Sequence, residues 1–222
     1  MSNIQQINRR DFVKLLGLAS GGILLGCNLS SGRKDFIPNI NGTLAPNLFV
    51  QILKDGSVIL MASRSEMGQG IRTSLASAIA DELEADWKYI TVKQATGDEK
   101  YGDQNTDGSR SVRTLLEPMR KMGAMVKLML ITAAAKRWNV AESECVAENH
   151  FVIHKNTNRE IFFGDLVEEA VKVRIPNQNN VQLKKVENFK FIGKNLKSVD
   201  LKDFTHGTAT YGIDVRMPDM KF

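Results

Sequence analysis

The spacing of the hydrophobic residues changes near residue 71, and this change constrains the fold more than any other feature of the chain. Two apolar runs, at 49–53 and 58–62, flank the segment Lys54-Asp55-Gly56-Ser57. An Asp-Gly pair between two such runs is a signal for a β-hairpin. Further along, apolar residues recur at every fourth position of an alanine-rich stretch, which is a helical period. They are Ile71, Leu75, Ile79 and Leu83. The sequence therefore predicts two antiparallel strands followed by a helix.

The next segments continue this alternation of strands and helices. We expect a strand at 90–94 and then a polar loop at 97–109, which contains three glycines. A helix is predicted at 112–138, with Pro118 near its first turn or at a kink.

The last structured segments are predicted to be a hairpin and a short helix. The hairpin would join 145–154 to 160–163 around Asn156-Thr157-Asn158, and the helix would begin at Gly164-Asp165. The resulting order, β-β-α-β-α-β-β-α, predicts an α+β fold in which helices pack on antiparallel strand pairs.

The first 27 residues have the features of an export signal. Arg9 and Arg10 precede a weakly hydrophobic run at 15–26, and this pattern resembles a twin-arginine signal. The run is nearer a dozen residues than the roughly 18 needed to span a bilayer. Leu24-Leu25-Gly26-Cys27 resembles a lipobox, in which Cys27 becomes lipidated. The polar stretch at 28–47 would then be a linker between a lipid anchor and the folded domain.

Composition excludes one broad class of function. The 222-residue chain carries a net charge of +5, and Arg9, Arg10 and Lys14 of the signal contribute to it. No basic run is interleaved with aromatic residues, so the sequence lacks the pattern of a nucleic-acid-binding protein. Its two cysteines, Cys27 and Cys145, imply no disulfide framework.

A glycine-containing loop at Met67-Gly68-Gln69-Gly70 lies between a predicted strand and the helix that starts near Ile71. Glycines allow close backbone approach, and unpaired N–H groups at a helix start can hold an anion such as a phosphate. A turn with no ligand would have the same sequence. A dinucleotide fingerprint would place glycine where Thr73 stands, which argues against a Rossmann domain.

Two further patterns are weaker candidates for metal binding. Asp103 to Gly108 resembles the start of a calcium loop, but its twelfth position is Thr114 instead of glutamate. His150 and His154 would share one face of a strand, with no evident third ligand, so an exposed hairpin is the preferred interpretation.

The order of these segments resembles a known family. Residues 66–70, Gly97-Asp98, 101–111 and 117–120 are similar to the molybdopterin-binding large subunits of isoquinoline 1-oxidoreductase and exported aldehyde dehydrogenases, in the xanthine oxidase family. The resemblance extends from the signal to Phe222.

The resemblance implies specific cofactor contacts. Met67, Gly68, Gln69 and Gly70 would contact the molybdopterin. A second loop at 106–111 would contribute Ser109 and Ser111, together with Gly108 and Arg110. The segment 207–220 resembles the first strand of the family's hammerhead domain. The chain would thus contain part of a molybdopterin-binding domain at 48–200 and the start of a hammerhead domain at 201–222.

The resemblance also implies an activity for the complete subunit. Enzymes of this family hydroxylate N-heterocycles or oxidise aldehydes with water, and a C-terminal glutamate acts as the base. Glu66 is a poor substitute for that base. The cofactor would be molybdenum-containing molybdopterin in its cytosine dinucleotide form. Electrons would pass to a small iron–sulfur subunit and on to a cytochrome c. We expect a periplasmic, lipid-anchored protein that is not catalytic on its own.

Two other functions remain open from the sequence. One is an exported lipoprotein that binds a ligand without catalysis. The other is an exported NADP-type dehydrogenase module, against which Thr73 and the expected absence of a βαβ order both count.

Overall fold

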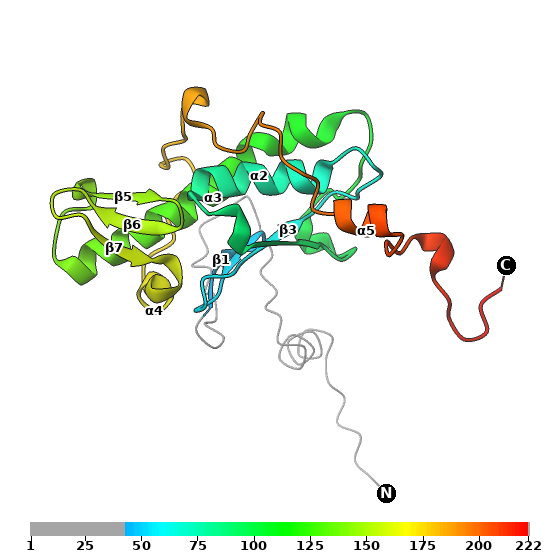
Figure 1. The fold of residues 1–222 in the computed structure, drawn as a ribbon, viewed down its shortest axis with the longest axis horizontal. Helices are drawn as coiled ribbons and strands as arrows, with labels where there is room; N and C mark the ends of the chain where they lie inside the picture. Colours follow the sequence, from blue (N-terminus) through cyan, green and yellow to red (C-terminus); the bar gives the residue numbers. More distant parts are fainter. Residues whose placement is uncertain (1–42, 222) are drawn as a thin grey trace, which may run out of the picture.

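The computed structural model describes residues 43–221, so the predicted signal and most of the predicted linker lie outside the described part. The strands there form two separate sheets, and the two longest helices, α2 and α3, pack against each other. Figure 1 shows both helices over one face of the first sheet, with the second sheet near the C-terminal end of α3. The predicted α+β class is confirmed.

The first sheet contains β1 (Leu44–Asn47), β2 (Val50–Ile52), β3 (Val58–Ala62) and β4 (Ile90–Gln94), and the second contains β5 (Cys145–Glu148), β6 (Phe151–His154) and β7 (Arg159–Phe162). The α-helices are α2 (Ile71–Leu83), α3 (Arg110–Trp138), α4 (Val167–Ala170) and α5 (Leu201–His206). Single 3₁₀ turns are η1 (Trp87–Tyr89), η2 (Glu99–Tyr101), η3 (Glu142–Glu144), η4 (Phe163–Leu166), η5 (Val186–Asn188) and η6 (Gly212–Asp214).

The first sheet confirms the predicted hairpin and extends it. β2 and β3 are antiparallel, with Val50 opposite Leu60 and Ile52 opposite Val58. β1 adds a further antiparallel strand, and Leu44 within it is buried. Residues 44–47 therefore belong to the sheet, and the prediction that they end a polar linker was wrong. β1 lies at the edge of this four-stranded sheet, a position at which a strand tolerates a proline.

β3 and β4 are parallel, with Val58 opposite Ile90 and Ala62 opposite Gln94. Helix α2 connects them, so β3-α2-β4 is a βαβ unit. The expectation that no βαβ order is present was therefore wrong. The antiparallel pairs are present, and β4 joins the first sheet through a parallel pair that was not predicted. Thr73 still occupies the position that a dinucleotide fingerprint requires to be glycine.

The second sheet differs from the predicted hairpin. Residues 145–154 form two strands, because the backbone turns at Asn149 (φ 46°) and His150 (φ 77°). His150 is fully buried: its Nδ1 accepts the Asp86 N–H at 3.1 Å, so Nε2 donates to the Gly56 carbonyl at 2.9 Å. His154 is also buried. The two histidines do not lie together on an exposed strand face, and the prediction of an exposed hairpin was wrong for both.

Residues 207–221 contain η6 but no strand. Ile213 and Met217 are 81% and 66% exposed there. A strand needs a neighbouring strand for its backbone hydrogen bonds, and none lies beside this segment in the described structure. The predicted strand at 207–220 is therefore absent here. Figure 1 shows α5 and this segment extending away from both sheets.

Two properties of the helices also bear on the predictions. Pro118 lies eight residues after the first residue of α3, beyond its first turn. Within residues 43–221, no helix is both long enough and apolar enough to cross a membrane.

Helices α2 and α3 approach closely at Gly123. A Cβ atom at this position would lie 2.3 Å from the Ile79 carbonyl oxygen and 3.1 Å from Cβ of Glu82. Any side chain there would force the two helices apart, so this glycine sets their separation.

We predict that Gly123→Ala lowers the free energy of unfolding by about 1–3 kcal/mol, the usual effect of overpacking a core. Without the close contact, replacing glycine by alanine inside a helix would raise the free energy of unfolding by roughly 1 kcal/mol. A decrease therefore shows that the contact leaves no room for the methyl group. Gly97→Ala is the control, because nothing lies within 4 Å of its Cβ position. Urea unfolding followed by circular dichroism measures both variants. A more stable Gly123→Ala protein would contradict the close contact of α2 and α3.

Candidate functional site

The parallel pairing of β3 and β4 brings two predicted loops to one edge of the first sheet. Ala62 and Gln94 are opposite each other at the ends of these strands. Each strand is followed by a loop and then by a helix, α2 after β3 and α3 after β4. Because parallel strands end at the same edge, both loops and both helix starts lie there.

The first loop is a compact turn built around its glycines. Gly68 and Gly70 have φ angles of 94° and 80°, which side-chain-bearing residues rarely adopt. Gln69 folds back on the loop: its Oε1 accepts the Met67 N–H at 2.6 Å and its Nε2 donates to the Ser65 carbonyl at 3.2 Å. Met67 is 68% exposed. The loop thus has a defined conformation held by its own side chains.

The start of α2 is occupied by a carboxylate of the chain itself. Glu66 Oε1 accepts the N–H groups of Gly68 at 2.9 Å and Gly70 at 2.8 Å, and Oε2 accepts that of Arg72 at 3.2 Å. Burial alone would raise the pKa of Glu66, but these backbone donors outweigh it and lower the pKa below its usual value. The prediction that these helix-start N–H groups are unpaired was wrong for Gly70 and Arg72.

The second loop leads into α3 through two left-handed residues, Gly108 (φ 51°) and Ser109 (φ 54°). Both are exposed, whereas Ser111 is buried. Arg110 pairs with Asp107 at 2.6 Å and lies 3.6 Å from Asp103. Of the predicted contact residues in this loop, Gly108 and Ser109 are exposed, Arg110 is half-buried and Ser111 is buried.

The calcium-like pattern forms no cation site. Its aspartates Asp103 and Asp107 are paired with arginines. In the part of the chain that the structure describes, no group of three or more His, Cys, Asp or Glu side chains is placed to hold a metal ion.

Arg64, which precedes the first loop, contacts the second loop. Its side chain is 2% exposed, donates to the Asn105 carbonyl and lies 3.3 Å from Asp103. The Asn105 N–H first, and then Arg64, lower the pKa of Asp103. A second link is the Thr106 hydroxyl, which donates to the Ser65 carbonyl at 3.0 Å. Arg64 was not predicted as a site residue, although a charged residue two positions after a buried strand is a signal that could have identified it.

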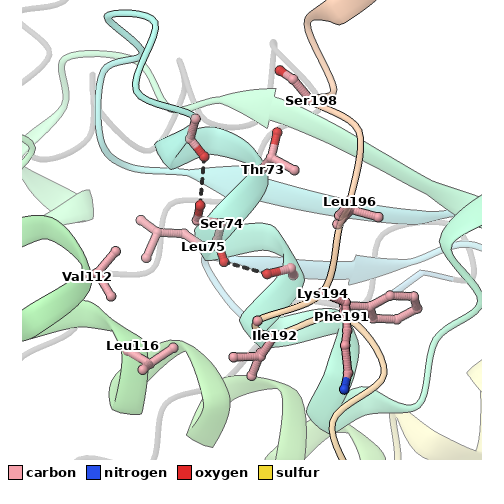
Figure 2. Close-up of a pocket in the computed structure, with 13 residues that line it drawn as sticks. Thr73, Ser74, Leu75, Val112, Leu116, Phe191, Ile192, Lys194, Leu196 and Ser198 are labelled. Atoms are coloured by element: carbon pink, nitrogen blue, oxygen red, sulfur yellow. Dashed lines mark hydrogen bonds between the residues drawn. The ribbon is translucent and has the colours of Figure 1, made fainter.

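A mostly apolar groove of about 430 Å³ lies beside the first loop, between α2, the start of α3 and the segment 191–198. Figure 2 shows Leu75 of α2 near Val112 and Leu116 of α3, with the segment carrying Phe191 to Ser198 on the other side. The Ser74 hydroxyl donates to the Gly70 carbonyl and the Ser77 hydroxyl to the Ser74 carbonyl, both at 2.8 Å. Their hydroxyl hydrogens are therefore not available to a ligand in the groove.

The groove's outer wall is held to α2 by buried carboxylates. Asp81 is fully buried and accepts the N–H groups of Phe191 and Ile192, both at 2.9 Å, and a bond from the Lys184 ammonium at 2.9 Å. Burial raises the pKa of Asp81, but these donors lower it further than burial raises it. Glu82, also buried, accepts from Arg120 at 2.8 Å. A segment without strands is thereby fixed over the helix.

The comparison with protein families decides the assignment. Residues 2–217 match the molybdopterin cofactor-binding domain. The chain belongs to this family. The resemblance to molybdopterin-binding subunits of the xanthine oxidase family is therefore confirmed.

Curated relatives of this molybdopterin-binding chain are oxidoreductases. It is 25% identical to the beta subunit of isoquinoline 1-oxidoreductase from Brevundimonas diminuta, over 98% of this chain and 33% of that protein. It is 29% identical to a membrane-bound aldehyde dehydrogenase of Gluconacetobacter polyoxogenes, whose name specifies pyrroloquinoline quinone, over 97% and 29%. It is 30% identical to a nicotinate dehydrogenase subunit of Pseudomonas putida, over 99% and 18%. The chain therefore spans a third or less of these proteins.

Among solved structures, quinoline 2-oxidoreductase from Pseudomonas putida 86 aligns with a TM-score of 0.46 and 22% identity. CO dehydrogenase from Oligotropha carboxidovorans aligns with a TM-score of 0.47 and 24% identity. Each alignment covers 53% of this chain and 15% of the other.

The loop residues fit one wall of a molybdopterin site. At Gly68 and Gly70 nothing lies within 4 Å of a Cβ position, so a ligand can approach the backbone. The N–H groups of Gln69 and Ile71 donate no hydrogen bond to any residue between 43 and 221. The buried Nε of Arg64 has no hydrogen-bond partner there either. Contacts of individual residues with the cofactor stay predictions.

Proposed function

We propose that this chain is the N-terminal part of the large subunit of an exported molybdenum hydroxylase or dehydrogenase. Its role would be to supply two cofactor-binding loops. The observation that carries this proposal is the convergence of both loops, 65–70 and 103–111, at one edge of the sheet in a chain whose family binds molybdopterin.

In this proposal the first loop binds through its backbone. Gly68 and Gly70 leave space for the ligand, and the N–H groups of Gln69 and Ile71 are available as donors. The exposed Ser109 and the guanidinium of Arg110 would contact it from the second loop, while the buried Ser111 would act through packing. When bound, the molybdenum centre supplies the redox chemistry, and these residues bind and orient it. We assign no catalytic base to this chain.

The proposed reaction is the oxidation of an N-heterocycle or an aldehyde with water. The names of the relatives support these substrate classes, since they refer to isoquinoline, aldehyde and nicotinate. Two of the three are named as subunits, which supports a partner chain. We propose a small iron–sulfur subunit as that partner and a cytochrome c as the later acceptor. The cytosine dinucleotide form of molybdopterin is likewise a proposal.

Export and anchoring rest on the sequence alone, because Arg9, Arg10 and Cys27 lie outside the described residues. We propose a twin-arginine route to the periplasm and a lipid anchor at Cys27. An enzyme that must acquire its cofactor before export has a reason to use a route for folded proteins.

The cofactor role predicts a loss of molybdenum from loop variants of the full subunit. Gln69→Ala removes the side-chain amide and its hydrogen bonds, a loss of about 1–3 kcal/mol. Cofactor retention should therefore weaken about tenfold or more. Gly68→Val should have a larger effect, because a β-branched side chain resists φ 94° and fills the open space. Molybdenum per subunit is measured by inductively coupled plasma mass spectrometry.

Two matched controls accompany this measurement. Gln182→Ala alters an exposed glutamine, and Gly207→Val places valine at another open glycine, with φ 69°. Both should retain the wild-type molybdenum content. A wild-type subunit without molybdenum, or equal contents in all variants, would contradict the proposed function.

Export should depend on the arginine pair, since lysine does not replace the guanidinium fork. Replacing Arg9 and Arg10 by lysine should leave the protein in the cytoplasm, whereas Cys27→Ser should release it from the membrane fraction. Cell fractionation and mass spectrometry of the mature N-terminus measure both effects. Undiminished export of the double-lysine variant would refute the route, and a non-acylated N-terminus away from Cys27 would refute the anchor.

A further inference from the structure

The start of α2 lacks the usual means of satisfying its backbone. Its N-cap residue is Gly70, which has no side chain to accept a hydrogen bond, and its first turn contains no acidic residue. Such a helix end attracts an anion from elsewhere, because its unpaired N–H groups carry partial positive charge.

Glu66 supplies that anion from within the loop. Its two carboxylate oxygens accept three backbone N–H groups, from Gly68, Gly70 and Arg72, at 2.8–3.2 Å. Hydrogen bonds to an ionised acceptor are stronger than neutral ones. The carboxylate also belongs to the same loop, so no ordering of a separate molecule opposes it.

The charged groups around Glu66 do not compete for these bonds. Arg72 pairs with Asp200 at 2.5 Å, and Arg64 pairs with Asp103 at 3.3 Å. Arg110, at the start of α3, pairs with Asp107. The carboxylate of Glu66 therefore interacts with the loop backbone and is free of other charged partners among the described residues.

This arrangement determines which donors the loop can offer to a ligand. The N–H groups of Gly68 and Gly70 point to Glu66, and that of Met67 points to the Gln69 amide. The N–H groups of Gln69 and Ile71, which have no acceptor among residues 43–221, are left for a ligand.

We propose that Glu66 is a positioning residue for cofactor binding. Its carboxylate replaces an external anion at the start of α2 and holds residues 67–70 in the conformation that presents the N–H groups of Gln69 and Ile71. The molybdopterin binds on the outer side of the loop, and Glu66 stays in place when it does. This inference rests on the proposed function of the loop.

The first test uses the 222-residue chain without cofactor and compares Glu66→Gln and Glu66→Ala with wild type. Amide hydrogen exchange of Gly68, Gly70 and Arg72 at pH 7, measured by NMR, should be at least tenfold faster in Glu66→Ala than in wild type. Glu66→Gln, which keeps one acceptor oxygen, should lie between them. Glu187→Gln removes the same charge at an exposed glutamate and should change nothing.

The second readout is the pH dependence of Tm. A carboxyl whose folded pKa is lowered stabilises the protein above its unfolded pKa, near 4.3 for glutamate, and this stabilisation is lost as the pH falls through the folded pKa. The Tm difference between wild type and Glu66→Gln should therefore be constant above about pH 5.5 and shrink towards pH 3.5. Equal exchange rates, or a difference independent of pH, would overturn the proposal.

Molybdenum content of the full subunit separates this proposal from the proposed function. Glu66→Ala should lose most of its molybdenum, Glu66→Gln should retain part, and Glu187→Gln should match wild type. Equal content in wild type and Glu66→Ala would overturn the role of Glu66 while leaving the proposed function intact. A wild-type subunit without molybdenum would overturn the proposed function, while the exchange and Tm results would still test whether Glu66 holds the loop.

Discussion

The parallel pairing of β3 with β4 is the constraint on which the rest of the structure depends. Because α2 crosses between these strands, both of their C-terminal ends lie at one edge of the sheet, and both helices begin there. The close contact at Gly123 then fixes α3 against α2. A site that uses residues about 40 positions apart becomes possible only through this topology, which places the loops 65–70 and 103–111 next to each other.

Three charged side chains, the buried Arg64 and Asp81 and the half-buried Glu66, hold the loops of this topology in place. Arg64 joins the second loop to the end of β3, and Glu66 holds the first loop on the start of α2. Near the C-terminal end of α2, Asp81 fixes the segment 190–192. Each of these groups satisfies backbone atoms that no regular secondary structure satisfies, which is the main reason a loop-rich edge can be well ordered. Removing Asp81 would leave the largely buried Lys184 side chain without one of its carboxylate partners.

Local patterns in the sequence were sufficient to predict most of the helices and strands. β3, α2 and β4 have the predicted bounds because hydrophobic period and turn residues are local signals. The parallel partner of β3 was not predicted, because pairing depends on contacts between distant segments. The turn at Asn149 and His150 lacks glycine and proline, so the sequence carried no strong signal for it. For the site, the two loops were identified from sequence, but the hydrogen bonds of Glu66 and Arg64 depend on how the loops fold. The strand predicted at 207–220 is absent for the same reason. A strand needs a partner strand, and the sequence of one segment does not show whether that partner is present.

The central claim is that the two loops form one cofactor surface. Hydrogen–deuterium exchange of the full subunit, compared with and without bound cofactor, measures this most directly. The account predicts that peptides covering 65–70 and 103–111 gain protection together on cofactor binding, with little change in the second sheet at 145–162. Protection confined to one loop, or located away from both, would contradict it.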